Sequence, residues 1–175
     1  MATIGTLQRL SAASLSKMLL AAQEAAAAGD PNIAIIDVRD DDYIGGHIKG
    51  SQNVPSRTLD AMLPTLVRQL QDKETVVFHC ALSQQRGPAA ALRYIRERER
   101  ILASLKGKKP SGDGAHVAKE DGVTAAVSGE GSQEVKEQKV YVLDRGFVGW
   151  QEAYGTDERL TEGYRKDLWE DGYWG

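Results

Sequence analysis

Short apolar runs alternate with longer amphipathic stretches along the chain. Three of the runs are rich in β-branched residues and bounded by turn-forming residues, which is typical of strands buried on both faces. These predicted strands lie at 33–36, 75–78 and 139–143. Apolar residues at helical spacing predict helices at 11–29, where Ser11 is the expected N-cap, and at 59–70, 88–105 and from 146 onward. Strands that alternate with helices indicate an α/β domain with a mostly parallel sheet.

Two segments depart from this alternation. Residues 106–138 carry six glycines and many charges but no Leu, Ile, Met or aromatic residue. Such a segment cannot bury enough apolar surface to offset the entropy of ordering, so we predict a flexible insertion. Residues 154–175 instead hold five of the eleven aromatic residues. We expect this segment to pack on the domain, and a partner-binding surface is the alternative.

The single cysteine among 175 residues, Cys80, lies just past the strand predicted at 75–78, and Arg86 precedes the next predicted helix. A strand–loop–helix turn directs backbone N–H groups and a helix N-terminus toward one point, which suits an anion. Arg86 can grip the same anion with two N–H groups. This setting favours the thiolate of Cys80, the form that attacks. The pattern therefore predicts an oxyanion site with a nucleophile at its floor.

The whole loop takes part in the predicted site. Cys80 and Arg86 are the candidate catalytic residues. The residues expected to bind the oxyanion alongside Arg86 are Ala81, Leu82, Ser83, Gln84 and Gln85. Ser83 could also donate a hydrogen bond to the sulfur. The alternative interpretation of Cys80 is a small buried apolar residue at a strand end, and the spacing to Arg86 argues against it.

Three segments resemble the rhodanese fold family, in the order that the family has. They are 35–39 continuing to 46–55, the Cys80 loop, and 140–150. The resemblance covers roughly residues 6–152 apart from the insertion. It implies a catalytic domain at 1–153, with three α/β/α layers and a central, mainly parallel five-stranded sheet.

The length of the loop distinguishes the branches of this family. His-Cys-x5-Arg followed by Gly87 and Pro88 is similar to the M-phase-inducer (cell-division-cycle) dual-specificity phosphatases and the related eukaryotic arsenate reductases. The first implies a phosphatase that forms a phosphocysteine. The second, a close alternative, implies an arsenate reductase that needs glutathione and glutaredoxin, because no second cysteine is present. A thiosulfate-type sulfurtransferase, whose loop is one residue shorter, and a non-catalytic phosphate-binding module are more distant alternatives.

Further residues of the matching segments are expected to support the loop rather than contact the substrate. They are Asp37, Arg39, His47 and His79. The phosphatase branch has acidic residues in its loop where this chain has Ala81 and Gln85, which removes groups proposed to assist proton transfer. The aspartate run at 40–42 could supply an acid, but we interpret it as a solvated turn.

The composition of the chain limits which binding partners and which cellular compartment we expect. The formal net charge of −3 argues against nucleic acid or an anionic membrane as a partner. One cysteine argues against a structural zinc site, and we expect no metal and no bound cofactor. The sequence shows neither signal-peptide features at its start nor a run of membrane-spanning length. We therefore expect a cytoplasmic or nuclear enzyme that acts on a phosphate- or arsenate-type oxyanion, with a phosphoprotein as one source of it.

Overall fold

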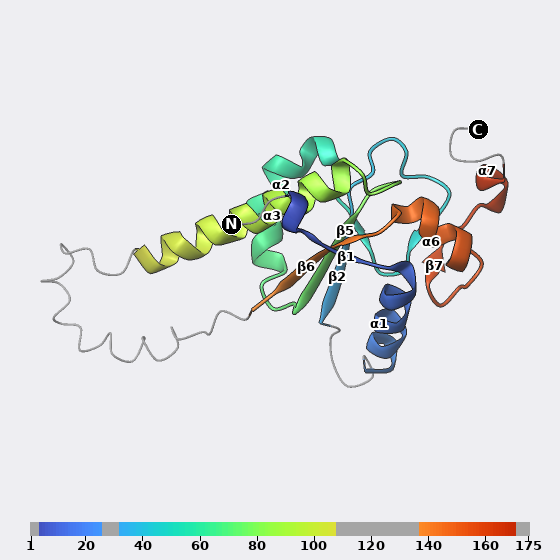
Figure 1. The fold of residues 1–175 in the computed structure, drawn as a ribbon, viewed down its shortest axis with the longest axis horizontal. Coiled ribbons are helices and arrows are strands. Elements are labelled where there is room, and N and C mark those ends of the chain that lie inside the picture. Colours follow the sequence, from blue (N-terminus) through green and yellow to red (C-terminus); the bar gives the residue numbers. More distant parts are fainter. Residues whose placement is uncertain (1–3, 26–31, 108–136, 171–175) are drawn as a thin grey trace, which may run out of the picture.

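The computed structural model describes residues 4–25, 32–107 and 137–170. Its centre is a five-stranded, all-parallel sheet with the strand order β1-β6-β5-β2-β4 (Figure 1). In that order the strands are Gln8–Leu10, Lys139–Leu143, Thr75–His79, Ile33–Asp37 and Gln52–Asn53. Helices flank the sheet, so the predicted α/β fold with a mainly parallel five-stranded sheet is confirmed.

Two apolar layers enclose the sheet because successive strand side chains point to opposite faces. Helices α2 (Leu59–Gln69) and α3 (Arg86–Gly107) cover the face that carries Ile36 and Phe78. Helices α1 (Ala12–Ala25) and α6 (Gly146–Tyr154) cover the face that carries Ile35 and Val77. The short helices are η1 (Ile4–Thr6), η3 (Ser56–Thr58) and α7 (Lys166–Trp169).

The observed starts of the helices can be compared with the predicted ones. The Ser11 hydroxyl oxygen accepts the Ser14 N–H at 3.0 Å, which is the N-cap bond expected for α1. The part of the predicted first helix beyond Ala25 lies outside the described residues. Helix α2 begins at Leu59, as predicted, and contains Pro64. Helix α3 begins at Arg86, two residues before the predicted start.

The periodicity of the sequence did not reveal the shortest strands. Strand β1 has three residues and β4 has two, which is too short for an alternating pattern. A second sheet pairs β3 (His47–Ile48) with β7 (Thr161–Glu162) in antiparallel fashion. This pairing joins the segment after α6 to the middle of the domain.

The aromatic C-terminal segment contacts the domain up to Glu170. The Tyr164 hydroxyl donates to Gln151 Oε1 at 2.6 Å. Trp169 Nε1 donates to the Gly45 carbonyl at 3.0 Å, and its ring lies 5.6 Å from that of Phe147. Tyr173 and Trp174, which we predicted to pack as well, lie outside the described residues.

Most of the predicted insertion at 106–138 lies outside the described residues. Residues 108–136 lie outside the described residues, and α3 continues to Gly107. Gln138 is fixed in place, since its Nε2 donates to the carbonyls of Leu70 at 2.8 Å and Lys73 at 3.0 Å. Its Oε1 accepts the Tyr94 hydroxyl at 2.7 Å. Gln138 therefore belongs to the packed domain and not to the insertion.

We expect Trp169→Ala to lower the melting temperature by about 3–6 °C, because the half-buried indole covers part of Phe147 and bonds the Gly45 carbonyl. Thermal unfolding followed by circular dichroism measures the shift. Leu168→Ala is the matched control, since Leu168 is the neighbouring residue of α7 and is 40% exposed. A Trp169→Ala protein that melts like the control would show that this segment adds no stability.

Candidate active site

Cys80 directly follows β5, the central strand of the sheet, and only 3% of it is exposed. The carboxyl ends of parallel strands meet at one edge, which is where ligands bind in such sheets. The loop that starts there closes at Arg86, the first residue of α3. Gly87 permits this closure, because a Cβ at that position would lie 3.2 Å from the Cα of His79.

Donors from two other elements hold the carbonyl groups of the loop. The N–H of Phe147 donates to the Cys80 carbonyl at 3.0 Å, and that of Val148 donates to the Ala81 carbonyl at 2.9 Å. Arg9 on β1 donates to the Ser83 carbonyl at 3.1 Å. In a trans peptide the C=O and the N–H point in opposite directions. The N–H groups that follow these carbonyls therefore point away from α6 and β1.

The start of α6 approaches the loop so closely that Gly146 is required there. Gly146 has φ +56°, and a Cβ on it would lie 2.5 Å from the carbonyl oxygens of Cys80 and Ala81. A side chain would push α6 off the loop. The sequence offered a signal here, since Gly146 opens a predicted helix, but its contact with the loop depends on the tertiary structure.

The loop presents several donors that have no protein acceptor. Within the described part of the chain, no acceptor is found for the N–H groups of Ala81, Leu82, Gln84 or Gln85. Ser83 is in the left-handed region, with φ +57°, and its N–H donates to Cys80 Sγ at 3.3 Å. Its buried hydroxyl has no partner among the described residues. Buried polar groups are normally paired, so this arrangement suits an anion above Cys80.

The predicted loop residues differ in burial. Ala81 and Ser83 are buried, and Leu82 is partly buried. The side chains of Gln84 and Gln85 are exposed. The Gln85 carbonyl accepts the N–H of Ala89 at 3.0 Å, which joins the loop to α3.

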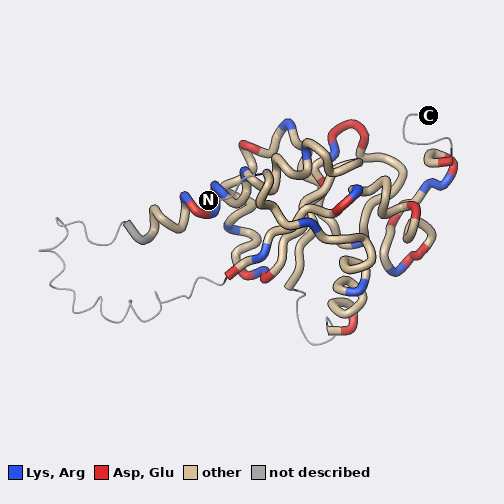
Figure 2. Tube along the Cα trace, viewed as in Figure 1, with Lys and Arg blue, Asp and Glu red and all other residues tan. Residues whose placement is uncertain are grey.

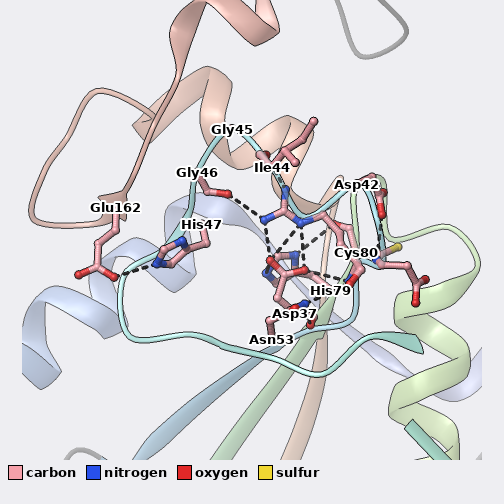
Figure 3. A network of polar contacts seen from close by, with 12 residues as sticks. Asp37, Asp42, Ile44, Gly45, Gly46, His47, Asn53, His79, Cys80 and Glu162 are labelled. Carbon is pink, nitrogen blue, oxygen red and sulfur yellow. Dashed lines mark hydrogen bonds and ion pairs between the residues drawn. The ribbon is translucent and has the colours of Figure 1, made fainter. Parts of the chain in front are cut away.

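His79 lies between Cys80 and Asp37 and is fully buried (Figure 3). Its Nδ1 lies 3.0 Å from the Cys80 carbonyl oxygen, so Nδ1 carries the proton of the neutral ring. Its Nε2 lies 3.7 Å from Asp37 Oδ2. Burial lowers the pKa of His79 by more than Asp37 raises it, which keeps the ring neutral near pH 7. His79 therefore fixes the Cys80 carbonyl without adding charge.

Asp37 and Arg39 form a buried ion pair at the end of β2. Arg39 Nη2 lies 2.7 Å from Asp37 Oδ2, and neither side chain is exposed. Arg39 also donates to the carbonyls of Ile44 at 3.4 Å and Gly46 at 2.9 Å. Burial raises the pKa of Asp37, but the hydrogen bonds and the charge of Arg39 bring it below its usual value. The pair holds the segment that carries residues 40–46.

His47 lies on the far side of this pair from Cys80 (Figure 3). Its Nε2 is 3.0 Å from Glu162 Oε1, and its ring stacks on Tyr43 with the ring centroids 5.7 Å apart. The structure thus brings Asp37, Arg39 and His79 to the base of the loop but places His47 in the contact between β3 and β7.

Two residues of the aspartate run reach Arg86. Arg86 donates to Asp42 from Nη1 at 2.8 Å and from Nη2 at 2.6 Å, and Nη1 also lies 3.3 Å from Asp40 Oδ2. Asp41, by contrast, has a side chain that is 90% exposed. The interpretation of the run as a solvated turn therefore holds for Asp41 alone. The signal that sequence reasoning missed is the position of the run, directly after the strand that neighbours β5.

The ion pairs decide the protonation of both carboxylates. The hydrogen bonds from Arg86 lower the pKa of Asp42 to about 2. Burial raises the pKa of Asp40, but the Ser56 hydroxyl, the Arg57 N–H and Arg86 bring it below its usual value. Both groups are ionised at neutral pH, so neither can donate a proton while Arg86 is paired with them.

Three further observations concern the described part of the chain. Lys and Arg are interspersed with Asp and Glu along the described chain (Figure 2). Among residues 4–25, 32–107 and 137–170, no cluster of three His, Cys, Asp or Glu side chains is arranged to hold a metal ion. In the same ranges, no helix combines the length and the apolar character that a bilayer crossing needs.

Comparison with known proteins identifies the family of the chain. Residues 20–153 match the family described as rhodanese-like domain. The chain is 32% identical over 145 residues to "CDC25-like phosphatase YCH1" of Saccharomyces cerevisiae, covering 77% of this chain and 76% of that protein. It is 37% identical over 141 residues to "Arsenate reductase 2.1" of Oryza sativa subsp. japonica, covering 80% of this chain and 69% of that protein.

A solved structure of the same family is also similar to this chain. The structure described as a yeast protein tyrosine phosphatase of the rhodanese family superposes with a TM-score of 0.64 at 29% identity. The superposition covers 94% of this chain and 99% of that one. The chain belongs to the rhodanese-like domain family, and its relatives include Cdc25-like phosphatases and arsenate reductases.

Proposed function

We propose that this chain is a cysteine-dependent phosphatase of the dual-specificity type, which acts through a phosphocysteine on Cys80. The observation that carries the proposal is the loop after β5. There a buried thiol lies beside N–H groups that have no acceptor among the described residues, and Arg86 closes the ring. Phosphoryl transfer depends mainly on positioning and on charge stabilisation of the equatorial oxygens, which such a ring supplies.

The reaction has two steps. Cys80 gives up its proton to solvent and its Sγ attacks phosphorus in line, so that an S–P bond forms while the P–O bond to the leaving group breaks and the leaving oxygen takes up a proton from solvent. Water then attacks the phosphocysteine and breaks the S–P bond, which releases inorganic phosphate, and a proton from that water returns the sulfur to the thiol. The Ser83 N–H, at 3.3 Å from Sγ, stabilises the charge on sulfur when it leaves phosphorus in the second step.

A second candidate, arsenate reduction, is favoured by the rice relative and by the neutral positions Ala81 and Gln85. Arsenate adds to Cys80 with loss of water, and glutathione supplies the second thiol. Arsenic(V) gains two electrons and leaves as arsenite, while the two sulfurs become a mixed disulfide that glutaredoxin reduces. We place either activity in the cytoplasm or nucleus, because a lone catalytic thiol needs a reducing compartment.

One experiment separates the candidates. The purified protein is assayed side by side on p-nitrophenyl phosphate, on arsenate with glutathione and glutaredoxin, and on thiosulfate with cyanide. We expect turnover of the aryl phosphate. Turnover of arsenate alone would replace the phosphatase proposal with the reductase, and turnover of thiosulfate alone would contradict both.

We expect Cys80→Ser to abolish turnover on whichever substrate is active, because a serine hydroxyl without an adjacent base is a poor nucleophile. The same variant should melt within about 2 °C of the wild type, since Oγ is smaller than Sγ and the Ser83 N–H keeps an acceptor. Steady-state rates and thermal unfolding measure the two properties. Wild-type turnover in a folded variant would refute the covalent mechanism.

Arg86→Lys should lower kcat/KM by at least about 100-fold, comparable to the loss of one oxyanion donor, although it keeps the positive charge. Lysine cannot reproduce a bidentate grip on a tetrahedral anion or on a carboxylate. Arg93→Lys is the control, because Arg93 lies two turns further along α3, is half exposed and contacts only Asp60 among the ion pairs of the described residues. An Arg86→Lys enzyme within a few-fold of wild type would show that Arg86 does not hold the anion.

A further inference from the structure

We propose that Asp42 is a positioning residue for Arg86. Its carboxylate holds one edge of the Arg86 guanidinium, so that the remaining N–H groups of the guanidinium are left for the oxyanion. The inference rests on the proposed function and deepens it, since it names the group that orients the cation of the site. Asp42 lies on the segment between β2 and β3, outside the loop itself.

The contact uses one edge of the guanidinium only. Arg86 donates from Nη1 to Asp42 Oδ1 at 2.8 Å and from Nη2 to Asp42 Oδ2 at 2.6 Å, a two-pronged pair. Such charge-assisted pairs fix direction as well as position. In the described part of the chain, every hydrogen bond found for Arg86 leaves from an Nη atom. The Nε–H and the outer Nη2–H, which form the second two-pronged edge, stay available to an anion.

The carboxylates that hold Arg86 are themselves fixed. Asp42 Oδ1 accepts the N–H of Asp40 at 2.9 Å. Asp40 in turn accepts the Ser56 hydroxyl at 2.6 Å and the Arg57 N–H at 3.1 Å. Neither carboxylate can follow Arg86 if the guanidinium leaves, so the pair acts as a rigid support for it.

Hydrogen bonds also hold the backbone that follows Asp42 in the chain. Three successive carbonyls accept hydrogen bonds, those of Ile44 and Gly46 from Arg39, and that of Gly45 from Trp169 Nε1 and the Arg165 N–H at 3.2 Å. The Asp37–Arg39 pair and the C-terminal segment therefore fix the same stretch of chain. A carboxylate on a braced stretch can orient a long side chain before substrate binds.

A rigid support matters because a free arginine side chain loses rotamer entropy when it closes on a substrate. Paired with Asp42, Arg86 has lost that freedom before the oxyanion arrives, and the equatorial oxygens meet a pre-set donor edge. The side chain of Arg86 is 32% exposed and that of Asp42 is 27% exposed, so the pair lies at the mouth of the site and one edge of the guanidinium remains accessible.

The test compares Asp42→Asn with Asp41→Asn. Both changes remove one negative charge from the same short run, but Asp41 is exposed and contacts Arg57 rather than Arg86. We expect Asp42→Asn to lower kcat/KM on p-nitrophenyl phosphate about tenfold or more, and to weaken inhibition by inorganic phosphate by a similar factor. Asp41→Asn should change both by less than about twofold.

A double-mutant cycle identifies the route of the effect. If Asp42 acts through Arg86, Asp42→Asn added to Arg86→Ala should change neither the rate nor the phosphate inhibition further. An undiminished effect in the Arg86→Ala background would overturn the proposal. So would tighter phosphate inhibition in Asp42→Asn alone, since that result means that Asp42 competes with the oxyanion for Arg86. A lower melting temperature with unchanged kinetics would reduce Asp42 to a stabilising residue, which also overturns it.

A binding measurement tests the role of Asp42 independently of whether the protein hydrolyses phosphate esters. Phosphate or arsenate should protect Cys80 from iodoacetamide, and Asp42→Asn should need about tenfold more anion for the same protection. If the wild type is protected but hydrolyses no phosphate ester, the phosphatase proposal fails and the role of Asp42 is still decided by the protection curves. If neither anion protects the wild type, no oxyanion binds at this loop and both proposals fall.

Discussion

The buried Asp37–Arg39 ion pair is the constraint on which the site depends. Taking two charges out of water costs several kcal/mol per ion, which only good geometry and further hydrogen bonds can offset. Here the Asp37 carboxylate accepts bonds from the Arg39 backbone N–H, Nε and Nη2. The Arg39 guanidinium also lies 4.4 Å from the centre of the Phe147 ring. Removing either partner would leave an uncompensated charge under the catalytic loop.

The segments that follow β2, β5 and β6 at the carboxyl edge of the sheet meet this pair or its neighbours. Asp37 and His79 are register partners on β2 and β5, and His79 holds the Cys80 carbonyl from one side. Phe147, which follows β6, holds the same carbonyl from the other side and stacks beneath Arg39. The two donors use both lone pairs of that oxygen, so the first peptide of the loop has one orientation. The direction of the Ala81 N–H in this peptide is thereby set by residues of β5 and α6.

The sequence predicted what is local and left out what depends on long-range contacts. The three buried strands and the turn at Cys80 follow from apolar runs and from the spacing to Arg86, because these signals lie within a few residues. The two-residue strands β3 and β7 carry no periodicity and exist because His47 and Glu162 are brought together by the fold. Gln138 illustrates the same limit, since a polar residue at the end of a glycine-rich stretch gives no sign of its three bonds to the domain.

The aspartate run matters through its charge, because it forms no recognisable sequence motif. A run of three aspartates after a strand is ordinary in a turn, and only the parallel register of β2 and β5 brings two of them to Arg86. With Asp40 and Asp42 both ionised, the Arg86 cluster carries a net negative charge before substrate binds. This cluster therefore adds no long-range attraction for a phosphate dianion. The short-range N–H groups of the loop and the free edge of Arg86 must supply the binding, which explains why a site of this kind needs its donors held so rigidly.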